Sequence, residues 1–180
     1  MDLDALRDLE RQGELPPLLL FWGHTGEGPG PWVLSQWYPA PFTVDGVRYA
    51  TAEHWMMAAK ARLFGDDEAL AQVLASDDPR DAKAAGRGVR GFDSRRWAAE
   101  ADGAVVAGSI AKFTSSELLS SYLLGTAPAV LVEASPVDAV WGTGLAADHP
   151  DARVPSRWPG TNRLGFALMA ARERMAADLV

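Results

Sequence analysis

The pattern of apolar and polar positions along the chain predicts a mainly helical protein with a few short strands. Helical spacing and capping residues predict helices over residues 2–12, 52–64, 68–76, 79–86, 95–113, 116–124 and 163–175. Short apolar runs predict strands over residues 18–22, 32–37, 42–44, 47–49 and 129–133. Asp45-Gly46 separates two of these runs and is a strong hairpin signal. Because helices dominate, we expect fold class α+β.

Polar residues and prolines just before the apolar stretches predict where the helices begin. Thr51 and Ser94 have side chains that cap helix N-termini. Pro79 suits the first position of a helix, and Gly86 is interpreted as the C-cap of that same helix. The helix that follows Thr51 matters most, because it contains the most informative polar residues.

The length of 180 residues predicts one domain, residues 15–180, preceded by a helical extension over residues 1–14. The chain has no cysteine, which excludes disulfides and thiolate chemistry. The acidic N-terminal segment is not a secretory signal, and no apolar run reaches the ~18 residues expected of a membrane span. We therefore expect a cytoplasmic protein without a membrane partner.

The formal net charge of −7 is unlike that of proteins that grip nucleic acid through many phosphates. Loose duplex binding is not expected, although a single flipped or terminal nucleotide needs only local positive charge. Seven tryptophans provide flat faces on which a base or ring can stack.

Glu53 and Lys60 are the first candidates for chemistry. They lie seven positions apart in the helix after Thr51, so they share one face about 10 Å apart along the axis. Glu53 stands in the first turn, where the helix dipole favours a carboxylate. The alternative is a solvated glutamate and a lysine that only covers an apolar face. His54 between them is interpreted as a core or capping residue.

Two glycine-rich segments suggest places where a ligand approaches the backbone. Arg87 follows Gly86 and has the fork geometry that binds phosphate, although a plain surface arginine fits equally well. In the second segment Asp138 has an acceptor for a ribose hydroxyl and Trp141 a stacking face, and Gly142 allows close approach. A tight turn with a packed tryptophan is the alternative there.

The last helix begins after Asn162, which either helps to bind an anion at the helix N-terminus or simply caps it. Near the N-terminus, Ser35, Gln36 and Trp37 either place polar and aromatic groups over a pocket or belong to a strand and turn. His24, His54 and His149 show no metal-binding spacing, so we expect neither a metal nor a cofactor.

Taken in order, these segments resemble the NADAR family, the domain of the bacterial riboflavin-intermediate N-glycosidases. The matching blocks are Phe21-Trp22, Ser35–Pro39, Asp45-Gly46, Ala52–Ala61, Gly86-Arg87, Ala111-Lys112-Phe113, Leu131–Glu133, Asp138–Gly144 and Asn162–Gly165. No block is specific alone, but the ordered set covers the chain from about residue 20 to residue 175. Gln36 departs from the asparagine that the family usually has, and Met57 and Ala59 stand where glutamines are common. These departures bear on which substrate binds.

The resemblance implies a hydrolase that cleaves the N-glycosidic bond between ribose and an amine. The implied substrates are ribosylaminopyrimidine phosphates or ADP-ribose on guanine, the latter also within nucleic acid. Glu53, Lys60 and Asp138 would be the catalytic residues. The substrate would be held by Ser35, Gln36, Trp37, Arg87, Trp141, Gly142 and Asn162. A module that binds ADP-ribose or a nucleotide without cleaving it is the alternative.

Overall fold

The computed structural model describes residues 1–178, and these residues form seven α-helices and four short strands. By their contacts they group into two compact units. The first unit comprises residues 1–35 and 121–178, and the second unit comprises residues 36–120. No helix within the described residues is long and apolar enough to cross a membrane. The secondary structure is that of an α+β protein, as the sequence predicts.

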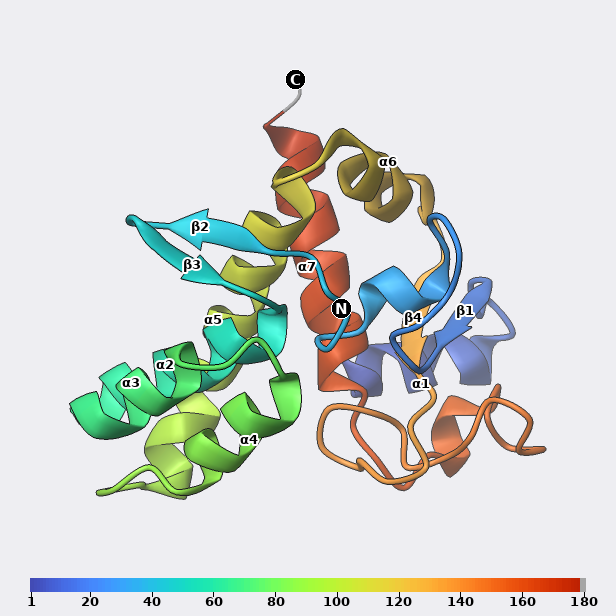
Figure 1. Ribbon diagram of the computed structural model, residues 1–180. Coiled ribbons are helices and arrows are strands. Elements are labelled where there is room, and N and C mark those ends of the chain that lie inside the picture. Colours follow the sequence, from blue (N-terminus) through green and yellow to red (C-terminus); the bar gives the residue numbers. More distant parts are fainter. Residues whose placement is uncertain (179–180) are drawn as a thin grey trace. The chain divides into compact units, whose positions relative to one another are not determined.

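The first unit is built on a parallel pair of strands from opposite ends of the chain. Its elements are α1 (Leu3–Gln12), β1 (Leu18–Phe21), η1 (Pro31–Leu34), β4 (Val130–Glu133), η2 (Pro155–Arg157) and α7 (Arg163–Ala177). Leu18 lies opposite Val130 and Phe21 opposite Glu133, so β1 and β4 run side by side (Figure 1). Helix α7 packs against β4, whose first three residues are fully buried.

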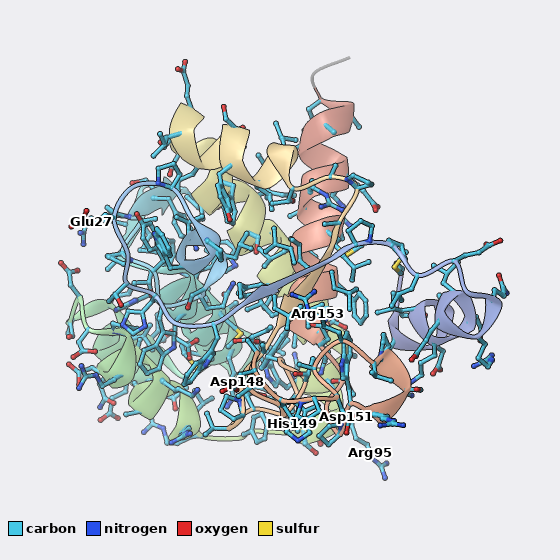
Figure 2. The ribbon with its side chains drawn as sticks, turned by 90° about the vertical axis from the view of Figure 1, so that its right-hand side faces the viewer. Glu27, Arg95, Asp148, His149, Asp151 and Arg153 are labelled. Atoms are coloured by element: carbon cyan, nitrogen blue, oxygen red, sulfur yellow. The ribbon has the colours of Figure 1, made fainter. Side chains whose placement is uncertain are left out.

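The segment before α7 has little regular structure, yet polar contacts fix it to the rest of the first unit. Arg153 donates from its guanidinium to the carbonyl oxygen of Leu18 at 3.2 Å, and Arg157 pairs with Asp151 at 2.7 Å. Figure 2 labels Arg153 on this segment and shows Asp151 next to His149. The first contact anchors the segment to β1, and the second lies within the segment and involves a residue of η2.

The second unit is a helical cluster with one hairpin. Its elements are β2 (Phe42–Val44), β3 (Val47–Tyr49), α2 (Ala52–Phe64), α3 (Asp67–Leu74), α4 (Pro79–Arg87) and α5 (Ser94–Thr114), and the chain leaves it within α6 (Glu117–Gly125). The hairpin turn has φ of 50° at Asp45 and 76° at Gly46, as a type I′ turn requires. The predicted hairpin is therefore confirmed.

Helix α2 is the centre of the second unit, because it packs against α3, α4 and α5 (Figure 1). The Thr51 side chain caps it by accepting from the His54 N–H, and Gly65 ends it in the left-handed conformation. Most of its residues are buried, and the Trp55 ring nitrogen donates to the Ala104 carbonyl of α5 at 2.7 Å. A helix surrounded on several sides is apolar on several faces, which explains its sequence.

Three sequence-based predictions of local structure are wrong. Residues 32–37 were expected to form a strand, but Pro31 begins a 3₁₀ helix that ends at Leu34. Gly86 was expected to end its helix, but α4 continues to Arg87 and Gly88 is its C-cap. Gly86 lies inside the helix for a packing reason, since a Cβ there would stand 2.0 Å from the Met57 sulfur. Ser94 was expected to cap a helix that begins at Arg95, but it is itself the first residue of α5, and the preceding Asp93 is the cap, accepting from the Arg96 N–H.

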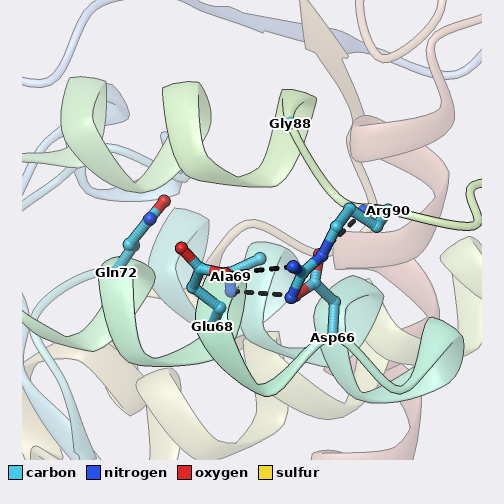
Figure 3. A pocket seen from close by; sticks show the side chains of 6 residues that line it. All are labelled: Asp66, Glu68, Ala69, Gln72, Gly88 and Arg90. Atoms are coloured by element: carbon cyan, nitrogen blue, oxygen red, sulfur yellow. Dashed lines mark hydrogen bonds and ion pairs between the residues drawn. The ribbon is translucent and has the colours of Figure 1, made fainter.

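A buried carboxylate joins α3 to the segment that follows α4. Asp66 accepts two hydrogen bonds from the Arg90 guanidinium and one from its backbone N–H, and it also caps α3 through the Ala69 N–H (Figure 3). Arg90 extends to Glu68 at 3.0 Å, beside a small hollow of about 210 Å³. These hydrogen bonds, those of the Arg90 side chain above all, hold the pKa of Asp66 well below its usual range.

Replacing Asp66 with asparagine should destabilise the protein at neutral pH, because the Arg90 side chain then loses the buried one of its two carboxylate partners. A depressed pKa in the folded state means that this stability exists above the unfolded value of about 4 and is lost as the pH falls below it. The midpoint of urea unfolding, measured from pH 7 to pH 3, should therefore be lower in Asp66→Asn at pH 7 and depend less on pH. The exposed Glu68→Gln is the control; equal midpoints for Asp66→Asn and wild type at pH 7 would contradict this role.

Candidate functional site

Glu53 is buried in the first turn of α2. Its side chain is only 3% exposed, so the alternative of a solvated glutamate is wrong. Its backbone N–H donates to the Gln36 carbonyl oxygen at 3.0 Å, which attaches the start of α2 to the segment before β2. A buried titratable group in the first turn of a helix is a candidate functional residue, because burial and the helix dipole both act on its charge.

Lys60 lies two turns further along α2 and is partly buried. Its ammonium donates to the Gly86 carbonyl oxygen at 2.7 Å and lies 4.1 Å from the centroid of the Phe92 ring. Burial lowers the pKa of Lys60, because the charged form loses contact with water. The amine is therefore held beside the end of α4, and it releases its proton more readily than an ordinary lysine does.

Gln36 lies next to Glu53 and is almost fully buried. Its backbone carbonyl is used by Glu53, but its side-chain Nε2 makes no hydrogen bond within residues 1–178. Buried donors of this kind are rare, and many of them face ligands or water. The neighbouring Ser35, at the end of η1, belongs to the first unit.

Trp37 and Arg87, which were selected separately in the sequence, line the same hollow of about 250 Å³ in the second unit. Arg80, Lys83 and Ala84 complete its lining, and all three lie on α4. The Lys83 ammonium stands 5.5 Å from the centroid of the Trp37 ring. Sequence reasoning missed Arg80 and Lys83, although their spacing from Arg87 already places the three side chains on one helical face.

In the first unit, Asp138 organises the loop after β4. Its Oδ1 accepts from the backbone N–H groups of Val140 and Trp141, both at 2.8 Å. The Arg163 guanidinium lies 4.9 Å from the centroid of the Trp141 ring. At Gly142 a Cβ would come within 2.9 Å of two backbone oxygens, so a glycine is needed for packing. The loop therefore has the tight turn that was expected as the alternative to a ligand site, and its tryptophan is half-buried.

Asn162 has a structural role that the sequence did not indicate. It is fully buried at φ 53°, and its side chain accepts from the Glu133 N–H and donates to the Leu131 carbonyl oxygen, each at 2.9 Å. It stands at the N-cap position of α7 but makes no capping hydrogen bond there. Its amide extends the hydrogen bonding of β4, and this position gives no support to a phosphate contact.

Two further titratable side chains are buried in the second unit. His54 bonds to the Ser76 carbonyl oxygen and the Thr51 hydroxyl, which confirms a core histidine. Lys112 on α5 is fully buried near the rings of Tyr38 and Phe113, and burial lowers its pKa to about 7. The Ala111-Lys112-Phe113 block was the only sequence signal for it. No group of three or more potential metal-binding side chains occurs in the part of the chain that the structure describes.

The second unit therefore contains Gln36, Trp37, Glu53, Lys60 and Arg87, and the first unit contains Ser35, Asp138, Trp141, Gly142 and Asn162. Within the second unit, the Gln36 carbonyl oxygen accepts a hydrogen bond from the Glu53 N–H, and Trp37 and Arg87 line the same hollow. Lys60 is tied to the residue that precedes Arg87. Two perturbed or buried titratable side chains on one helix, with an aromatic ring and cations nearby, are features of an enzyme site.

Comparison with known proteins identifies the class. The family model of the NADAR domain matches residues 20–176. The N-glycosidase R617 of Acanthamoeba polyphaga mimivirus is 35% identical over 165 residues, which are 89% of this chain and 97% of that protein. The N-glycosidase YbiA of Escherichia coli K12 is 32% identical over 138 residues, 77% of this chain and 78% of its own length.

A solved structure agrees with these sequence matches. The NMR structure of the E. coli protein YbiA superposes with a TM-score of 0.73 at 28% identity, covering 91% of this chain and 87% of that one. The relatives named N-glycosidase define an enzyme of the hydrolase class. The chain belongs to the NADAR family. With relatives named N-glycosidase along most of its length, it is an N-glycosidase.

Proposed function

We propose that this enzyme hydrolyses the bond between ribose and an amine nitrogen in ribosylaminopyrimidine phosphates or in ADP-ribosylated guanine. The observation that carries the proposal is the pair on α2, a buried Glu53 and a partly buried Lys60 with a lowered pKa. Pure binding of a nucleotide needs no such pair. N-glycoside hydrolysis needs both a proton for the leaving nitrogen and a group that takes up the sugar carbon.

Glu53 is proposed as the acid and base. As an acid it would protonate the departing nitrogen, and as a base it would then take a proton from the attacking water. Its burial keeps competing water away from the carboxyl group. The Gln36 amide is proposed as a polar contact for the substrate near it, because its Nε2 has no hydrogen bond within the described residues.

Lys60 is proposed as the nucleophile. An exocyclic ribosylamine opens when its C1–O4 bond breaks, the N–H proton passes to O4 and a C1=N double bond forms. The neutral Lys60 amine adds to C1, and the substrate amine leaves with a proton from Glu53, which transfers the C1=N bond to Lys60. Water then hydrolyses this bond and releases the sugar, so that one water is consumed overall. In the alternative role, Lys60 only holds a phosphate or orients Glu53.

The remaining roles follow the family pattern. Trp37 and Trp141 are proposed to stack on the base, Arg87 to bind phosphate and Asp138 to accept from ribose hydroxyls. Ser35 and Gly142 are proposed as further substrate contacts. For Asn162 we propose support of the backbone in place of the phosphate contact, because its amide is used by β4.

The test is to incubate the protein with a ribosylaminopyrimidine 5′-phosphate and with an oligonucleotide carrying ADP-ribosylated guanine. Released base and sugar are followed by mass spectrometry. Release from the first substrate alone makes this enzyme a metabolite N-glycosidase, and release from the second makes it an ADP-ribosyl glycohydrolase. Tight ADP-ribose binding without release from either would refute the proposal in favour of a binding module.

A further inference from the structure

Helix α1 lies outside the residues that the family model matches, yet it packs against η2, in the segment that leads to α7. Leu6 in the middle of α1 is fully buried. Leu3 and Leu9, three positions to either side, are partly buried and lie on the same face of the helix. One apolar face therefore attaches α1 to the rest of the first unit.

Two polar side chains of α1 bind the backbone of η2. The Glu10 carboxylate accepts from the Ser156 backbone N–H at 2.8 Å and from the Ser156 hydroxyl at 3.2 Å. Arg7, one turn earlier, donates from its Nε to the Pro155 carbonyl oxygen at 3.2 Å. Each of these hydrogen bonds has one charged partner, which makes it stronger than a bond between neutral groups. The place of η2 in the first unit therefore depends on α1.

The chain runs from η2 directly into contact with the loop after β4, residues 138–144. Three consecutive residues donate backbone hydrogen bonds of 2.8–3.0 Å to this loop: Gly160 to Thr143, Thr161 to Ala139 and Asn162 to Gly142. A Cβ at Gly160 would stand 2.4 Å from the Gly142 carbonyl oxygen, so the two backbones lie close together. Two residues separate η2 from Gly160, and one of them is the buried Trp158. Because so short a connection has little slack, a displacement of η2 moves the loop as well.

We propose that α1 is a strap that positions the loop after β4 for substrate, and that Glu10 and Arg7 are its positioning residues. The inference rests on the proposed function, which assigns ribose hydroxyls to Asp138 and the base to Trp141 in this loop. Glu10 and Arg7 act through η2 and not on the substrate itself. A loop that is already ordered loses less conformational freedom when substrate binds. Loss of the strap should therefore weaken substrate binding and leave the chemical step unchanged.

The test is amide hydrogen exchange, followed by NMR, in the full chain with Glu10→Ala or Arg7→Ala. The amides of Gly160 and Thr161 should exchange about three- to tenfold faster in both variants, the effect of one hydrogen bond of ordinary strength. Amides of α2, in the second unit, should keep their wild-type rates. Glu14→Ala is the matched control, because Glu14 is an exposed glutamate two residues beyond the end of α1.

Exchange and turnover together separate this inference from the proposed function. If exchange rises at Gly160 and Thr161 but neither proposed substrate is cleaved, the strap stands and the reaction is wrong. If a substrate is cleaved, Glu10→Ala should raise KM about three- to tenfold and leave kcat unchanged. Three results would overturn the strap: wild-type exchange in both variants, a rise spread equally over both units, or faster exchange with an unchanged KM.

Discussion

Replacing Glu53 with glutamine should abolish turnover while the protein stays folded. The glutamine has nearly the same shape, so the buried position remains filled, but it can neither give nor take a proton. General acid–base catalysis contributes about 10²–10⁴-fold to a rate, and kcat should fall by that factor. Steady-state kinetics on whichever substrate is cleaved provides the measurement, with circular dichroism and thermal unfolding to establish the fold.

Glu100→Gln provides the control, since Glu100 is an exposed glutamate on α5 of the same unit and should leave kcat unchanged. Full activity in Glu53→Gln would remove this residue from the mechanism.

Replacing Lys60 with arginine should also abolish turnover, and it distinguishes the two roles of this residue. Arginine keeps the positive charge and can still donate to the Gly86 carbonyl, so the packing of α2 on α4 is preserved. It cannot add to C1 of the sugar, because it stays protonated. With a Schiff-base nucleophile, kcat of Lys60→Arg should fall at least 10³-fold, and borohydride should reduce the wild-type intermediate to a stable adduct at Lys60. Peptide mapping by mass spectrometry locates the adduct, with Lys83 as an internal control.

The pH dependence gives an independent check on Lys60. Desolvation lowers its pKa, so the neutral, nucleophilic amine becomes available at lower pH than for an ordinary lysine. The rate should therefore rise with pH and level off before the usual lysine range near 10.4. An active Lys60→Arg variant without a trapped adduct would show that Lys60 acts through its charge alone.

Local sequence signals predicted most of the fold because capping residues, turn residues and prolines lie at the element ends that they favour. Thr51 caps α2, Asp45-Gly46 forms the hairpin, and Pro79 begins α4, as each residue type favours. The errors arose where contacts between distant residues decide the structure. Gly86 looked like a helix end, but it serves the packing of Met57, which lies far away in the sequence. Periodicity along one segment contains no information on such contacts.

The candidate site was predictable to a similar extent. The sequence selected Glu53 and Lys60 from their spacing, but burial, which sets their chemistry, depends on α4 and α5 packing around α2. Trp37 and Arg87 were selected separately, and only the fold places them on one hollow. Asn162 was interpreted as a helix cap or anion site, whereas its amide completes the edge of β4. A side chain that makes hydrogen bonds in place of a backbone partner produces no periodic pattern in the sequence, so the sequence alone does not reveal it.

The parallel pairing of β1 with β4 also constrains the order of folding. All of the second unit lies between these strands in the sequence, so their pairing closes a very long loop and has a correspondingly high entropic cost. The second unit is one continuous stretch of chain, and its helices pack through contacts close in sequence, which form rapidly. During synthesis the helices around Glu53 and Lys60 can assemble while β4 is still on the ribosome. We therefore expect assembly of the first unit to be the late, non-local step in the folding of this enzyme.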